Sequence, residues 1–166
     1  MGPPILALVI GINKYKKFPC LEGAVADANL FEKFLKERLN VPNADIINLR
    51  DEKASRASII SAFASLRDWP TYEKNEAAII IFYAGHGAQE DKPTAWQNWD
   101  TRNGRIEMLC PSDIGCPVNG KECEGIPDRS ISALLNQISK VKSNNIVSVF
   151  DSSECQTLNL NCFRRL

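Results

Sequence analysis

The chain has no excess of charge of either sign. Its 166 residues carry 20 lysines and arginines against 20 aspartates and glutamates, so the formal net charge at pH 7 is zero. Nucleic acids and anionic membrane surfaces are normally bound by basic patches, and this sequence contains no basic run. We therefore expect no nucleic-acid partner and no membrane partner.

Long apolar segments are also absent. The first twelve residues, MGPPILALVIGI, have no basic residues in front, and their apolar stretch is too short to cross a bilayer or to act as a secretion signal. Met1-Gly2 does not begin a myristoylation signal either, because Leu6 stands at the sixth position. These absences predict a soluble, cytoplasmic protein.

The cysteines lack a metal-binding spacing. There are six, and Cys110, Cys116 and Cys123 lie close together in a stretch rich in Pro and Gly, but without a C-x-x-C pair and far from any histidine. Without a secretion signal, we expect reduced thiols rather than a disulfide framework. A structural zinc site is only weakly indicated, and the metal assignment stays open.

A phosphate-binding loop is missing as well. The residues after the first apolar run, Gly11-Ile12-Asn13-Lys14, have neither the Rossmann nor the P-loop spacing of glycines. This argues against a flavodoxin-like domain that holds a small ligand at the edge of its sheet.

What the chain does contain is an alternation of apolar runs and amphipathic segments. The length fits one domain, 1–166, with a short tail at 1–4, a divergent tail at 154–166, and surface loops across 90–127. This order predicts an α/β fold with a mostly parallel sheet and helices on both faces. Strands are expected at 5–12, 45–49, 77–83, 105–110 and 145–150, and helices at 24–39, after an N-cap at Ser55, and after a cap at Asp128 or Ser130.

The stretch 77–89, AAIIIFYAGHGAQ, carries the only histidine, His86. We expect His86 in a turn at the carboxyl end of a central strand, where ligands and catalytic groups collect in such sheets. A lone histidine more often satisfies a loop by hydrogen bonding, but this position favours catalysis. If the last strand is its neighbour, residues 151–155 emerge beside it. A nucleophile next to a histidine base, with the Gly87 N–H for an oxyanion, is the minimum needed for acyl transfer.

Four motifs in this order resemble a known family. They are V-I-G-I-N-x-Y near the start of the chain, L-E-G-A-V-A-D-A in the first helix, Y-A-G-H-G-A-Q, and F-D-S at the end of the last strand. Together they resemble the large catalytic subunit of caspase-type peptidases, and among these the metacaspases of the peptidase C14 type, over about residues 5–152. The resemblance implies a caspase-like three-layer sandwich and, from the wider family, a part in programmed cell death.

The resemblance also implies particular residue roles. It implies a cysteine endopeptidase with a Cys/His dyad that cleaves after Arg or Lys, with His86 as the catalytic histidine. Asp27 and Asp151 match the acids of the pocket for the basic residue, and Ala84 stands where many members carry a serine that shapes that pocket. Two carboxylates would hold a guanidinium through charge-assisted hydrogen bonds. The alternative is that Asp27 caps or solvates its helix and Asp151 caps a loop.

The nucleophile departs from the family pattern. Ser153 stands where the resemblance implies the catalytic cysteine, and a serine hydroxyl is much less acidic than a thiol. Cys155 lies two residues further along and is better interpreted as an ordinary cysteine than as a displaced nucleophile. The sequence also ends soon after Ser153, so the resemblance implies a chain truncated before the small subunit. The last strand would then present an uncovered apolar edge that invites pairing with another chain.

Two functional classes stay open. One is a basic-residue-specific cysteine endopeptidase domain, impaired by Ser153. The other is an inactive pseudoprotease or regulatory fragment that binds peptides or a related caspase-like chain. No cofactor is required by the sequence, although the resemblance implies Ca²⁺ stimulation, for which Asp100 and Asp113 are candidates only because they are acidic and near.

Overall fold

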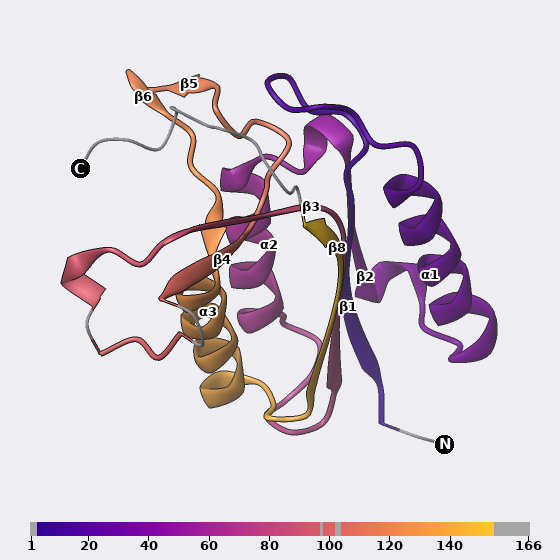
Figure 1. Ribbon diagram of the computed structural model, residues 1–166. Coiled ribbons are helices and arrows are strands. Elements are labelled where there is room, and N and C mark those ends of the chain that lie inside the picture. Colours follow the sequence, from indigo (N-terminus) through magenta and orange to yellow (C-terminus); the bar gives the residue numbers. More distant parts are fainter. Residues whose placement is uncertain (1–2, 97, 102–103, 155–166) are drawn as a thin grey trace.

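The chain folds as three layers. The structure, a computed structural model, describes residues 3–96, 98–101 and 104–154. A six-stranded sheet lies between α1 (Ala24–Arg38) on one face and α2 (Arg56–Arg67) and α3 (Asp128–Val141) on the other (Figure 1). The predicted α/β class with helices on both faces is confirmed.

The sheet is parallel in its centre. Its main path runs β2-β1-β3-β4-β7, and β8 pairs with β3. β2, β1, β3 and β8 are parallel, whereas β4 and β7 are antiparallel to their neighbours. The bounds are β1 Ile5–Gly11, β2 Ile46–Arg50, β3 Ala78–Asp91, β4 Arg105–Leu109, β7 Ile126–Pro127 and β8 Ile146–Glu154.

β3 is longer than the sequence indicates. The predicted break at Gly85 is wrong, because β3 continues as a single strand to Asp91. Its first half pairs with β1 up to Ala84, and its second half pairs with β4 from Gly87 onward. Antiparallel pairing thus compensates for the low strand propensity of the glycines. His86 therefore lies inside a strand and not in a turn.

The span 90–127 is also more regular than predicted. The predicted strand at 105–110 is confirmed as β4, and the span also contains the end of β3, β7 and a hairpin of β5 (Pro117–Val118) and β6 (Lys121–Glu122). Of the two predicted helix caps, one forms and one does not. Ser55 caps α2 as predicted, accepting from the N–H of Ser58, but α3 follows Pro127, and no side-chain cap forms there.

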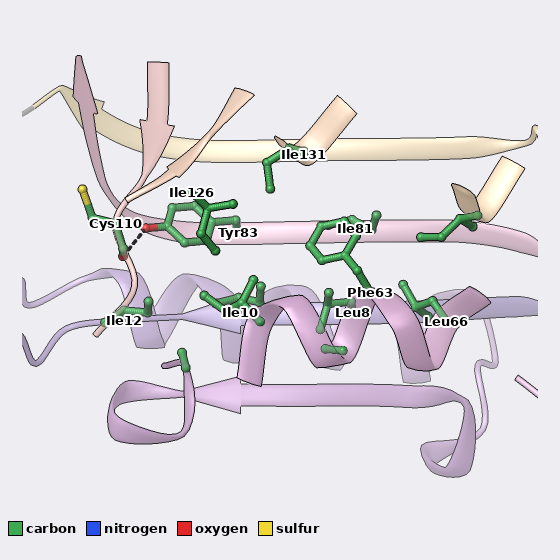
Figure 2. Close-up of a cluster of buried hydrophobic side chains, with 14 of the residues drawn as sticks. Leu8, Ile10, Ile12, Phe63, Leu66, Ile81, Tyr83, Cys110, Ile126 and Ile131 are labelled. Carbon is green, nitrogen blue, oxygen red and sulfur yellow. Dashed lines mark hydrogen bonds between the residues drawn. The ribbon is translucent and has the colours of Figure 1, made fainter. Parts of the chain in front are cut away.

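The core fills both faces of the sheet. On the face covered by α2 and α3, alternate residues of β1 and β3 pack against Phe63 and Leu66 of α2, and Tyr83 is fully buried (Figure 2). On the α1 face, Phe82 stacks on Phe31 with ring centroids 4.3 Å apart. Because both faces of β1 and β3 are covered, their sequences are continuous apolar runs.

Gly11 sets how closely α1 approaches the end of β1. A Cβ at this position would lie 2.5 Å from the Ala28 Cβ and 2.8 Å from the Ala24 carbonyl oxygen, so the helix would have to move. We expect Gly11→Ala to lower the free energy of unfolding by about 3 kcal/mol, measured by urea denaturation. Gly23→Ala is the matched control, because its Cβ would meet only Asp27 Oδ2 at 3.5 Å. Equal stability of the two variants would contradict the prediction.

β8 leaves one edge of the described sheet open. It pairs with β3 along its whole length, and among the described residues no further strand lies beyond it. Val147, Val149 and Phe150 are 52%, 37% and 42% exposed, whereas Ile146 at the start of the strand is half-buried against the core. This agrees with the predicted uncovered apolar edge. The tail at 155–166, including Cys155, lies outside the described residues.

Candidate active site

His86 lies where β3 changes partners. The carbonyl of Ala84 accepts from the N–H of Ile12 at the end of β1, and the carbonyl of His86 accepts from the N–H of Cys110 just after β4. Residues 84 and 86 point their backbone groups to the same edge of β3, so β1 and β4 occupy that edge in succession. The His86 N–H falls in the gap between these two strands.

A loop after β1 fills this gap. The hydroxyl of Tyr15 accepts a hydrogen bond of 2.9 Å from the His86 N–H, and the Tyr83 hydroxyl lies 2.7 Å from the His86 carbonyl oxygen. The Tyr15 and Phe18 rings lie 4.7 and 6.2 Å from the imidazole, between ring centroids. Backbone and ring of His86 are therefore both fixed, and the residue is only 4% exposed.

The imidazole has one partnered and one unpartnered nitrogen. Nε2 lies 2.8 Å from the carbonyl oxygen of Pro19. A carbonyl can only accept, so Nε2 carries the proton in the neutral ring and Nδ1 presents a lone pair. Nδ1 is buried and has no hydrogen-bond partner among the described residues. The ring is thus oriented by a backbone acceptor, as histidine bases commonly are, and its basic nitrogen is available for a proton.

Two tyrosine hydroxyls converge beside the histidine and stay neutral. Burial raises the pKa of Tyr15 to about 12, and burial also raises the pKa of Tyr83 well above its ordinary value. Both hydroxyls act as hydrogen-bond groups rather than as acids at physiological pH. They leave no room for a side chain between them, because a Cβ on Gly85 would lie 2.7 Å from each hydroxyl oxygen.

Residue 153 is the register partner of His86. β8 runs parallel to β3 and pairs Gly85 with Ser152, His86 with Ser153, and Gly87 with Glu154. Neighbouring strands lie about 4.8 Å apart, so the backbone at Ser153 is directly beside the histidine. The predicted neighbourhood of His86 and the segment after Phe150 is confirmed at the level of the backbone.

Gly87 lies between two strands. It is the register partner of Leu109 in β4 as well as of Glu154 in β8. A Cβ at Gly87 would lie 3.2 Å from both Cβ and Oγ of Ser152. Glycine at this position therefore avoids a close contact with the Ser152 side chain on β8. Its role as an oxyanion donor stays a prediction.

The three predicted pocket residues lie on the α1 face. Ala84 is buried in β3 beneath α1, and Asp151 is its register partner on β8. Asp27 lies in the first turn of α1, and both carboxylates are exposed. Asp151 is thus beside Ala84 in the sheet, whereas Asp27 belongs to the helix above it, and the binding of one ligand by both acids stays a prediction.

No metal centre is apparent in the part of the chain that the structure describes. It contains no group of three or more His, Cys, Asp or Glu side chains that could hold an ion. Asp113 instead accepts from the N–H of Arg56 at the start of α2, and burial raises the pKa of the nearby Cys123 to about 12. The calcium and zinc sites considered from the sequence therefore stay predictions. Nor does any helix among them have the length and apolar content needed to cross a membrane.

Sequence reasoning did not single out the residues that orient the imidazole. Tyr15 belongs to the motif V-I-G-I-N-x-Y, so its position at the carboxyl end of the first strand was a usable signal. Pro19 acts through a backbone carbonyl, which leaves no signal in the side-chain pattern.

Sequence and structure comparisons agree with this architecture. The crystal structure of a Geobacter sulfurreducens protein superposes with a TM-score of 0.65 over 92% of this chain and 51% of that chain, at 21% identity. At that identity the match concerns the fold alone, which is caspase-like. The sequence model described as "Metacaspase, peptidase C14 domain" matches residues 6–160.

Several curated relatives are named metacaspases. Metacaspase-1 of Lodderomyces elongisporus is 30% identical over 116 residues, 65% of this chain and 25% of that protein. Metacaspase-1 of Cryptococcus neoformans is 32% identical over 114 residues, 65% and 23% of the two chains. Metacaspase-3 of Arabidopsis thaliana is 28% identical over 111 residues, which are 64% of this chain and 29% of that protein. The chain spans about a quarter of the length of these relatives.

The fold and the position of the buried histidine are those of a caspase-like domain. The chain belongs to the metacaspase family, peptidase C14, whose model covers nearly all of its length.

Proposed function

We propose that this chain is a metacaspase-type endopeptidase domain for cleavage after Arg or Lys, in which His86 acts with residue 153 and Ser153 lowers turnover. The observation that carries the proposal is a buried imidazole whose Nε2 is held by Pro19 and whose Nδ1 has no partner among the described residues, with residue 153 as the register partner of His86. A base, an orienting acceptor and a nucleophile position in this order constitute the arrangement used for covalent acyl transfer.

The chemistry follows from the two ring nitrogens. Nδ1 of His86 takes the proton of the nucleophile at residue 153, while Nε2–H stays bonded to the Pro19 carbonyl and holds the imidazolium in place. The nucleophile attacks the scissile carbonyl, and the Gly87 N–H is the proposed donor to the oxyanion. Nδ1–H then protonates the leaving amine, and water hydrolyses the acyl-enzyme through the same base.

Ser153 is the weak part of this arrangement. A thiol with a pKa near 8.5 transfers its proton to an imidazole readily, whereas a serine hydroxyl normally needs a histidine supported by a third, anionic group. The acceptor for His86 is a neutral carbonyl. We therefore expect low turnover in the chain as it stands, with the peptide-binding surface retained.

Substrate preference is assigned to Asp27 and Asp151. Asp151 is exposed on β8 as the register partner of buried Ala84, and Asp27 is exposed in the first turn of α1, the helix that covers this face. A guanidinium would pair with such carboxylates through charge-assisted hydrogen bonds.

Asp27→Asn and Asp151→Asn are each expected to weaken binding of an Arg-ended peptide about tenfold, because each removes a charged acceptor. The measurement is fluorescence anisotropy of labelled peptides ending in Arg or in uncharged norleucine. Glu37→Gln is the matched control, because Glu37 is an exposed acid near the other end of α1. If the two asparagine variants bind both peptides as the parent does, these residues do not form the basic pocket.

A second function is favoured by Ser153 itself. A pseudoprotease would bind the same peptides without cleaving them, or would associate with a related caspase-like chain through the apolar open edge of β8. Hydrolysis of fluorogenic Arg and Lys peptides, with and without calcium, separates the two functions. Measurable turnover that disappears in His86→Ala supports the peptidase; saturable binding without turnover supports the pseudoprotease. Calcium stimulation, a cytoplasmic location and a part in cell death stay predictions of the resemblance.

A further inference from the structure

The loop that orients His86 is closed at its base by Asn13. The Asn13 carbonyl accepts from the N–H of Leu21 at 2.8 Å, and its Nδ2 donates to the Glu22 carbonyl at 3.2 Å. Its Oδ1 accepts from the N–H of Val25 at 3.1 Å, in the first turn of α1. One side chain therefore joins the start of the loop, its end and the following helix.

Asp51 fixes the same point from the other side. Its Oδ1 accepts from the N–H groups of Asn13 and Lys14, at 2.8 and 2.9 Å. Asp51 adopts φ 45°, a left-handed conformation that non-glycine residues seldom adopt without compensating contacts. Every backbone and side-chain polar group of Asn13 thus has a partner, and the entry to the loop is fixed between β2 and α1.

Both groups that hold His86 lie within this closed loop. Tyr15, whose hydroxyl accepts from the His86 N–H, comes two residues after Asn13, and Pro19, whose carbonyl holds Nε2, comes two residues before Leu21. Pro19 itself is exposed, and its carbonyl is held between the buried side chain of Phe18 on one side and the closed end of the loop at Leu21 on the other. Phe18 fixes only one side, so an ordered loop base contributes to keeping the Pro19 carbonyl 2.8 Å from the ring.

We propose that Asn13 is a positioning residue for the catalytic imidazole: by closing the 13–22 loop it holds the Pro19 carbonyl against Nε2 and leaves Nδ1 as the base. This inference rests on the proposed function for its effect on turnover, but not for its effect on the imidazole. The Asn13 side chain also accepts from the Val25 N–H in the first turn of α1, the turn that carries Asp27. The same amide therefore contacts both the loop that holds the histidine and the helix start of the proposed pocket.

The test uses the fact that the chain contains a single histidine. Incorporating ¹⁵N-histidine gives imidazole signals that need no assignment, and they report the tautomer and the exchange of Nε2–H with water. Asn13→Ala removes both side-chain bonds. Asn13→Asp keeps an oxygen for the Val25 N–H, where a carboxylate suits a helix N-terminus, but removes the donor to Glu22. Gln137→Ala is the matched control, because it deletes an exposed amide that bonds Arg67 on the opposite face.

We expect exchange of the His86 Nε2–H to accelerate about tenfold in both Asn13 variants, with a minor Nδ1–H tautomer appearing, because the acceptor no longer stays in place. Exchange of the Ile81 backbone amide, in the middle of β3, measures global opening in the same sample. In the Ser153→Cys chain, we expect kcat for Arg peptides to fall about tenfold with Asn13→Asp while KM stays within about twofold.

Two outcomes overturn the inference. One is an unchanged Nε2–H exchange rate and tautomer in both variants. The other is an acceleration that the Ile81 amide and the Gln137→Ala chain show equally, since that would report loss of stability alone. Selective acceleration at His86 in a chain whose Ser153→Cys form hydrolyses no peptide would support the positioning role and reject the proposed peptidase instead.

Discussion

Replacing Ser153 by cysteine is expected to raise hydrolysis of Arg-ended peptides by this chain about a thousandfold. The structure places residue 153 in register with His86, whose Nδ1 is buried and unpartnered among the described residues. A thiol beside such a base forms a thiolate–imidazolium pair, which a serine hydroxyl does not do at neutral pH. Loss of a nucleophile in related dyads and triads changes kcat by several orders of magnitude, so its restoration should be equally visible.

The measurement is kcat/KM for fluorogenic peptides ending in Arg, Lys or Glu. Ser152→Cys is the matched control, because it adds the same thiol one residue earlier, opposite Gly85 instead of His86. We expect the gain only at position 153 and only for the basic peptides. A similar rate for both cysteine variants, or none for either in a chain that still binds Arg peptides, would reject His86 as the base for residue 153.

The sequence predicts the layers of this fold because its apolar runs are fully buried. β1 and the first half of β3 lie under helices on both faces, so nearly every residue in them is buried. The sequence of each strand is therefore a continuous apolar run that can be recognised without the structure. The same reasoning fails after Ala84. There the strand continues through Gly85 and Gly87, whose residue types disfavour strands, because β4 and β8 supply partners that only tertiary structure can provide.

The residues of the candidate site likewise fall into those that the sequence predicts and those that only the structure reveals. His86 and residue 153 were predicted from their place after two apolar runs, since parallel strands end at a common edge. Pro19 was not, because a backbone carbonyl leaves no signal in the side-chain pattern. Asn13 stands in the motif V-I-G-I-N-x-Y, but that it closes the loop through its amide is apparent only in the structure. The acids of the pocket rest on the family resemblance, and their geometry agrees with it only as far as sharing the α1 face.

Removing the basic nitrogen of His86 is expected to return the Ser153→Cys chain to about one thousandth of its activity, since proton transfer by a placed base contributes roughly 10²–10⁴-fold. His86→Gln is the sharper substitution. Its amide N–H can still donate to the Pro19 carbonyl, and its planar end can still lie beside the Tyr15 ring, but it has no titratable group. We expect kcat to fall while KM for Arg peptides changes little.

Alkylation gives a second measurement that does not need turnover. In the Ser153→Cys chain, iodoacetamide should modify residue 153 at pH values below the ordinary thiol pKa of about 8.5, because the imidazolium stabilises the thiolate. With His86→Gln the pH profile should move back to that of an ordinary thiol, and mass spectrometry separates residue 153 from exposed Cys20. An unchanged profile would mean that His86 does not share a proton with residue 153. In that case the buried imidazole, held by Pro19 and packed against Tyr15, would serve the fold and not the chemistry.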